Sequence, residues 1–153
     1  MYLGIDLGGT NIAVGLVDEN GKILSKDSTP TLAEREYPEI IKDMITLSEK
    51  VVQAAGFNMS DVEAIGVGSP GSIDYENGRV AYANNIKFHN TPVRDEINKY
   101  YDIPVFLEND ANAAAFGEYI AAGDGAKVFA AITLAFVVLY NLNNINISER
   151  RRE

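Results

Sequence analysis

The 153-residue sequence contains no cysteine and only one histidine. Without cysteine the chain can form neither a disulfide nor a thiolate metal site, which fits a protein of the reducing cytoplasm. Basic residues are scarce too, because 13 Lys and Arg stand against 22 Asp and Glu, for a net charge of -9. Nucleic acids and anionic membranes both attract basic surfaces, so this charge argues against partners of either kind.

The sequence also lacks the segments that take a chain to or through a membrane. Its first residues have no positive stretch followed by an apolar run, as a signal peptide would have. The longest apolar-rich segment, residues 128–142, is too short to span a bilayer. With 46% hydrophobic and 23% charged residues, the composition is that of a globular chain, and we expect a soluble, cytoplasmic protein.

Turn residues divide the start of the chain into three short apolar segments. We expect strands at residues 2–7, 11–17 and 22–28, joined as antiparallel neighbours by the tight-turn sequences Gly8-Gly9 and Asp18-Glu19-Asn20-Gly21. A Rossmann domain would instead place a helix after its first glycine turn. The sequence therefore predicts an α/β fold that opens with three antiparallel strands.

Helices and strands alternate after these three strands. Pro38 and Gly56 bound an amphipathic helix whose predicted inner face comprises Ile40, Ile41, Met44, Ile45, Val51, Val52 and Ala55. The order βββ-α-β-α-β-α-β predicts one domain, a mixed sheet with helices packed on it. The remaining predicted strands are residues 63–68, 103–108 and 128–134, and the remaining predicted helices are residues 91–101 and 109–122.

The composition changes near the end of the sequence. No glycine follows Gly125, although glycines punctuate nearly every turn before it. We therefore expect a domain at residues 1–134 and an atypical tail at residues 135–153, produced by a frameshift or a truncation. Because residues 128–142 are β-prone and nearly uncharged, we also expect a homo-oligomer to form through this apolar segment.

The first segment suited to chemistry is Asp6-Leu7-Gly8-Gly9-Thr10-Asn11. Paired glycines let a backbone approach an anion closely and turn its N–H groups toward it. Thr10 adds a hydroxyl donor, and Asp6 is suited to hold a hydrated Mg²⁺ ion through water. A plain hairpin turn is the alternative, since Gly-Gly is a standard turn sequence.

Two further segments lie in predicted loops. Gly68-Ser69-Pro70-Gly71 follows a buried strand, where small ligands usually bind, but a tight surface turn is the alternative. Asn84-Asn85 places two amides in an otherwise apolar stretch, and turn formation again explains it. His89 has no carboxylate or second ligand near it in the sequence, which predicts an exposed loop histidine.

The last segment, Glu108-Asn109-Asp110-Ala111-Asn112, lies where a strand ends and a helix begins. Asp110 is a candidate general base for a hydroxyl group, with Asn109 hydrogen-bonding the substrate beside it. Helix capping is the alternative, because Asn and Asp are favoured N-cap residues. The repeat of polar residues is denser than one cap requires.

In this order and spacing the four segments resemble the ROK family of bacterial sugar kinases, which includes glucokinases, fructokinases and N-acetylhexosamine kinases. The resemblance spans about residues 1–134 and is carried by IDLGGTNIAVGLVDENGKIL, AIGVGSPGSID, ANNIKFHNTPV and PVFLENDANAAAFGEYIAAG. It implies an actin/hexokinase-like, ribonuclease H-like fold of two lobes, with ATP and a sugar bound between them.

The resemblance also implies an ATP- and Mg²⁺-dependent enzyme that phosphorylates a hexose hydroxyl, with Asp110 as the catalytic base. The implied contacts to ATP phosphates come from Asp6, Gly8, Gly9, Thr10 and Asn11, with Asp6 holding Mg²⁺ through water. The implied sugar contacts come from Gly68, Ser69, Pro70, Gly71, Asn84, Asn85, Asn109 and Asp110.

The sequence departs from the family after Leu134, where the family continues into a second glycine-rich phosphate loop. The family's zinc-binding Cys/His segment, its further sugar-binding residues and its adenosine loop have no counterpart in this sequence. We therefore expect the chain to be an inactive N-terminal fragment. The alternatives are a non-catalytic sugar-binding or structural remnant, or part of a ROK-type transcriptional regulator, which Met1 disfavours by lying one residue before the first strand.

Overall fold

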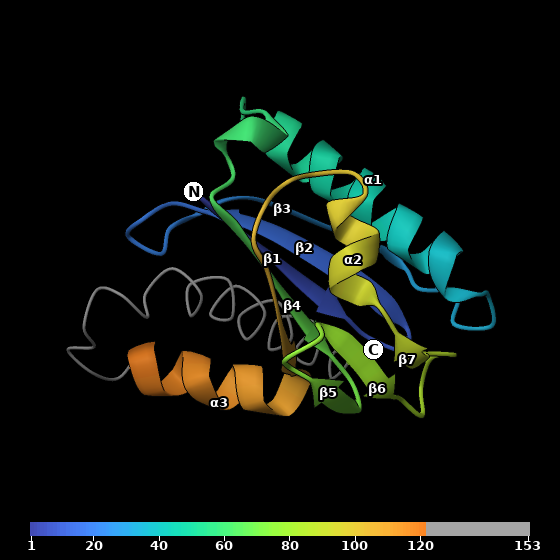
Figure 1. Ribbon diagram of the computed structural model, residues 1–153. Helices are drawn as coiled ribbons and strands as arrows, with labels where there is room; N and C mark the ends of the chain where they lie inside the picture. Colours follow the sequence, from blue (N-terminus) through green and yellow to red (C-terminus); the bar gives the residue numbers. More distant parts are fainter. Residues whose placement is uncertain (122–153) are drawn as a thin grey trace, which may run out of the picture.

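A computed structural model describes residues 1–121 of the chain, and its centre is a five-stranded sheet (Figure 1). The strand order is β3-β2-β1-β4-β8. β1 pairs antiparallel with β2, and β2 with β3, whereas β1–β4 and β4–β8 are parallel pairs. The bounds are β1 Tyr2–Leu7, β2 Asn11–Val17, β3 Ile23–Pro30, β4 Ala64–Ser69 and β8 Val105–Asn109.

Three antiparallel strands therefore open the domain, as the turn sequences predict. Gly21 takes a φ of +83° and donates its N–H to Asp18 at 3.2 Å. The Asp18 carboxylate accepts from the backbone N–H groups of Asn20 and Lys22 at 2.8 and 2.9 Å. These local bonds close the β2–β3 hairpin and fix its register.

A second, three-stranded sheet lies beside the carboxyl end of β4 and was not predicted. It has the order β5-β6-β7, with β5 Ser72–Asp74, β6 Arg79–Tyr82 and β7 His89–Thr91. For this region we expected loops, around residues 68–71 and 84–85 and at His89. Strands this short carry too few residues for an apolar alternation to show in the sequence.

Helices cover the main sheet on both sides (Figure 1). α1 (Tyr37–Ala54) and α2 (Val93–Asn98) pack on one face, and α3 (Asp110–Ala121) leaves the end of β8 on the other. A single 3₁₀ turn, η1 (Met59–Asp61), links α1 to β4. None of the helices within residues 1–121 is both long and apolar enough to cross a membrane.

The core lies between α1, α2 and the main sheet. Alternate residues of β1 and β2 point into it, and the inner face of α1 covers them. Gly56, with a φ of +83°, ends α1 by donating its N–H to Gln53 at 2.9 Å. Ala55 is only partly buried at the helix end, but the other predicted inner-face residues are buried: Ile40, Ile41, Met44, Ile45, Val51 and Val52.

Some boundaries differ from those expected. β3 begins one residue later and ends two residues later than predicted, and α2 is shorter than residues 91–101. The Asn98 side chain ends α2 by donating to the carbonyls of Tyr101 and Ile103 at 2.9 and 2.8 Å. The predicted strand at 128–134, the tail at 135–153 and the apolar segment at 128–142 lie outside the described residues.

Candidate functional site

The ends of three parallel strands meet at one edge of the main sheet. In the strand register, Asp6 of β1 stands opposite Gly68 of β4, which stands opposite Glu108 of β8. One residue further along, Ser69 stands opposite Asn109. The carboxyl edge of parallel strands is where ligands bind in open α/β sheets. The fold thus brings three of the four predicted segments together.

Asp110 is close enough to Asp6 at this edge to act on its carboxyl electrostatically. Burial, and after it the negative charge of Asp110, raises the pKa of the Asp6 carboxyl to about 6. A cation near Asp6 would offset both effects. Within residues 1–121 no three acidic or His side chains gather into a metal centre. Magnesium here would therefore depend on water and phosphate oxygens for its other ligands.

The turn between β1 and β2 has the compact shape that its glycines permit. The Gly8 N–H donates to the Asn11 carbonyl at 3.0 Å, and a Cβ on Gly8 would lie 2.8 Å from that oxygen. Within residues 1–121 the N–H groups of Gly9 and Thr10 donate to no other backbone group. Thr10 is exposed, so the turn presents donors of the kind that bind phosphate.

Gly9 brings the fourth predicted segment to the site. A Cβ at Gly9 would lie 2.8 Å from the Asn85 Cβ and 3.2 Å from the Asn85 carbonyl oxygen. The loop between β6 and β7 therefore packs directly on the β1–β2 turn. Asn84 is exposed, and among residues 1–121 no hydrogen bond links its side chain to the other predicted site residues.

Thr31 anchors the β1–β2 turn and was not predicted as a site residue. Its side chain is fully buried, its hydroxyl donates to the Gly8 carbonyl at 2.7 Å, and its N–H donates to the Thr10 carbonyl at 2.8 Å. In the sequence, a threonine just after β3 is only a weak signal for such a role. The contact with Gly8 depends on how the end of β3 lies beside the β1–β2 turn.

Asn109 joins the β8–α3 connection to the loop after β4. Its side-chain nitrogen donates to the Gly71 carbonyl at 2.7 Å. Its side-chain oxygen accepts from the N–H groups of Ala111 and Asn112 at 3.0 and 3.3 Å. The capping alternative is thus correct as a description of the helix start, and the same side chain also fixes the neighbouring loop.

The loop after β4 is held tightly against the small sheet. Gly71 has a φ of +94°, and a Cβ there would overlap the carbonyl oxygen of Tyr82. Ser69 is fully buried and Pro70 is buried, with the Ser69 hydroxyl donating to the Pro70 carbonyl at 3.2 Å. The backbone of this loop, more than its side chains, is therefore what a ligand would meet.

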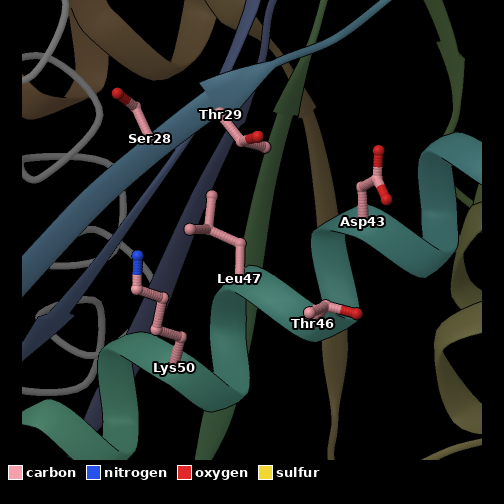
Figure 2. Close-up of a pocket in the computed structure, with 6 residues that line it drawn as sticks. All are labelled: Ser28, Thr29, Asp43, Thr46, Leu47 and Lys50. Carbon is pink, nitrogen blue, oxygen red and sulfur yellow. The ribbon is translucent and has the colours of Figure 1, made fainter.

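Two features lie apart from this edge. His89 is exposed as predicted but belongs to β7, where its ring packs edge-on against Tyr82 with centroids 6.2 Å apart. A pocket between β3 and α1 contains none of the predicted site residues (Figure 2). Its lining residues are Ser28, Thr29, Asp43, Thr46, Leu47 and Lys50.

Comparison with known proteins identifies the family. Residues 2–135 match the sequence model of the ROK family. The chain belongs to this family. It is 42% identical over 134 residues to a glucokinase from Thermotoga maritima, a match that covers 86% of this chain and 41% of that protein. It is 32% identical over 116 residues to a xylose repressor from Caldicellulosiruptor bescii, covering 76% of this chain and 29% of the repressor.

Solved structures of ROK proteins share the architecture. A ROK glucokinase from Streptomyces griseus, crystallised with glucose and AMPPNP, superposes with a TM-score of 0.70 at 35% identity. That match covers 82% of this chain and 38% of the glucokinase. The mixed sheet with its antiparallel start is the actin-like fold of the ROK kinases, as the resemblance implied. The chain spans about two fifths of the length of these glucokinases.

Proposed function

We propose that this chain carries the sugar-binding side and the first phosphate turn of an ATP-dependent hexose kinase. The observation that carries the proposal is the meeting of Asp6, Asn109 and Asp110 at the shared carboxyl edge of β1, β4 and β8. Similarity to glucokinases supports a hexose as the acceptor. Backbone donors for phosphate oxygens and a carboxylate base for the attacking hydroxyl are groups that serve phosphoryl transfer.

In the proposed reaction, Asp110 accepts the proton of a sugar hydroxyl while that oxygen forms a bond to the γ-phosphorus of ATP. The bond from that phosphorus to the β-phosphate oxygen breaks, and ADP leaves. The Gly9 and Thr10 N–H groups and the Thr10 hydroxyl stabilise charge on phosphate oxygens. Asp6 would hold Mg²⁺ through water, and the bound ion would supply further positive charge to the phosphates.

Asn109 and the backbone of residues 68–71 hold the sugar in this proposal. The hydrogen bond from Asn109 to Gly71 fixes both partners before the sugar arrives, so little freedom is lost on binding. Asn85 contributes from the β6–β7 loop that packs on Gly9. Several such donors and acceptors discriminate strongly among sugars, since an unmatched buried polar group is costly.

Calorimetric titration with glucose, mannose, fructose and N-acetylglucosamine tests the proposal. We expect one of these sugars to bind, and Asp110→Ala to weaken that binding at least about tenfold. His89→Ala is the matched control, because His89 is exposed and outside the edge. No binding of any of these sugars, or equal binding by the Asp110 variant, would contradict the proposal.

We further propose that residues 1–153 alone transfer no phosphate to a sugar. One lobe cannot enclose ATP, and exclusion of water favours transfer over hydrolysis. A coupled assay for ADP release with each of the four sugars checks this. Sugar-dependent turnover that Asp110→Asn abolishes would show that the 153 residues suffice.

A non-catalytic sugar sensor is the second candidate. The match to a xylose repressor, which covers 76% of this chain, supports it. Titration with xylose beside glucose separates the two candidates. Xylose binding that is indifferent to Asp110→Asn favours a sensor, whereas glucose binding that depends on Asp110 favours the kinase.

A further inference from the structure

Glu108 gathers three hydrogen bonds on one side-chain oxygen beside the candidate base. It accepts from the Asn109 N–H at 2.8 Å, from the Asn112 side-chain amide at 3.2 Å and from the Tyr75 hydroxyl at 2.6 Å. Two of these donors flank Asp110 in the sequence. The carboxylate therefore connects two residues at the start of α3, Asn109 and Asn112, and limits how this first turn can move.

The donor from outside this turn, Tyr75, belongs to the β5–β6 hairpin. Tyr75 is 53% exposed, so burial does not explain why its hydroxyl is directed at Glu108. An exposed tyrosine can reach many partners in water. A hydroxyl bonded at 2.6 Å indicates that the hairpin itself presents the side chain in this direction.

Arg94 of α2 connects that hairpin to the main sheet through hydrogen bonds. Its guanidinium donates to the carbonyls of Tyr75 and Glu76, both at 3.3 Å, and to the carbonyl of Val105 at 3.0 Å. Gly78 makes room for it, since a Cβ there would lie 2.6 Å from the Arg94 Cβ. The hairpin is thus fastened to β8, the strand that contains Glu108.

We propose that Tyr75 and Glu108 are positioning residues that hold the Asn109–Asp110 turn in the geometry needed to bind the sugar. The inference rests on the proposed function for the role of that turn. Neither residue belongs to the predicted set of sugar or phosphate contacts. They act through Asn109 and Asn112, by fastening the helix start to the Arg94-braced hairpin.

Two tyrosine variants of the 153-residue chain provide the test. Tyr75→Phe removes only the hydroxyl that donates a hydrogen bond to Glu108. Tyr82→Phe is the matched control, because Tyr82 is also 53% exposed on the same small sheet, and within residues 1–121 its hydroxyl makes no hydrogen bond to another side chain. Amide hydrogen exchange is measured at Ala111 and Asn112, whose N–H groups Asn109 caps, and glucose binding is measured by calorimetry.

We expect Tyr75→Phe to speed exchange at both amides by about fivefold and to raise the Kd for glucose by a similar factor, with urea unfolding unchanged. Tyr82→Phe should leave all three unchanged. Equal exchange in the two variants overturns the positioning role. If the unmodified chain binds neither glucose nor any of the other three sugars, the proposed function fails, and the exchange comparison still decides whether Tyr75 holds the turn.

Two variants of Glu108 separate positioning from simple loss of structure. Glu108→Gln keeps an oxygen that accepts from Asn109 and Tyr75, so exchange and glucose binding should stay within about twofold of the unmodified chain. Glu108→Leu has no acceptor and should exceed the effect of Tyr75→Phe. A Gln variant as impaired as the Leu variant would show that the charge of Glu108, and not its accepting role, is what matters, and would contradict the proposal.

Discussion

Asn109 donates to the carbonyl of Gly71 at 2.7 Å across the edge of the sheet, while the other end of its amide caps α3. One side chain therefore completes a helix start and fixes a loop from a different part of the chain. Capping and ligand binding looked like rival explanations for this residue in the sequence. In the structure they are compatible, because each uses a different atom of the amide.

The two ends of the Asn109 amide can be tested separately. Asn109→Asp keeps the oxygen that caps α3 but places a second oxygen against the Gly71 carbonyl, so we expect glucose binding to be lost with the helix start intact. Asn109→Ala loses both bonds and should destabilise the chain by about 1–2 kcal/mol. Urea unfolding and calorimetry measure the two effects. Undiminished glucose binding by the Asp variant would show that the Gly71 contact is dispensable.

A side chain at Gly71 should be far more damaging than one at another glycine with a similar backbone angle. At Gly71 φ is +94° and a Cβ would lie 2.8 Å from the Ala83 Cα, whereas Gly56 has a φ of +83° and nothing within 4 Å. We expect Gly71→Ala to cost about 3 kcal/mol or more and Gly56→Ala about 1 kcal/mol. Thermal unfolding of both variants gives the comparison, and equal losses would refute a steric role for Tyr82 and Ala83.

The partly buried carboxyl of Asp6 should make stability depend on pH. Burial raises the pKa of Asp6 to about 6, above its value in the unfolded chain. The folded state then binds more protons than the unfolded state between about pH 4 and pH 6, so the stability that protonated Asp6 contributes is lost as pH rises through this window.

Asp6→Asn isolates this contribution. The free energy of unfolding of the unmodified chain should fall relative to that of the variant by about 2 kcal/mol between pH 4 and pH 7. Urea unfolding of both proteins at each pH unit measures the difference. A difference that does not change with pH would mean that Asp6 titrates as an exposed carboxyl does.

Thr31 should matter more than another threonine whose hydroxyl also bonds to a carbonyl. Thr31→Val removes the 2.7 Å hydrogen bond from the Thr31 hydroxyl to the Gly8 carbonyl and should lower the free energy of unfolding by about 1–2 kcal/mol. Thr46→Val is the matched control, because its exposed hydroxyl bonds within α1 to Lys42 at 3.0 Å, and it should change stability by less than about 0.5 kcal/mol. Urea unfolding measures both, and equal losses would contradict the anchoring role of Thr31.

The sequence predicted the main sheet well because its signals are local. Gly8-Gly9 and Asp18–Gly21 mark tight turns, and the apolar period of residues 40–52 marks the face of α1 that is buried. The small sheet escaped prediction since strands as short as β5 and β7 depend on pairing partners, not on their own composition.

The candidate site shows the same limit. Asp6, Asn109 and Asp110 could be selected from residue type and position at the ends of predicted strands. The contacts of Thr31 with Gly8 and of Tyr75 with Glu108 could not, because each joins positions far apart in the chain through side chains that are common in any loop. The roles in sugar and phosphate binding remain predictions.

The strand order β3-β2-β1-β4-β8 has a consequence for how the chain folds. β1 ends at Leu7, but its parallel neighbour begins at Ala64 and the next at Val105. Two long segments of chain must therefore be brought back to the sheet before Asp6 meets Asp110, and pairings between positions so distant in the sequence slow folding. The carboxylate pair consequently forms only when β4 and β8 have joined β1, which makes the Asp6 titration a reporter of these two long-range pairings.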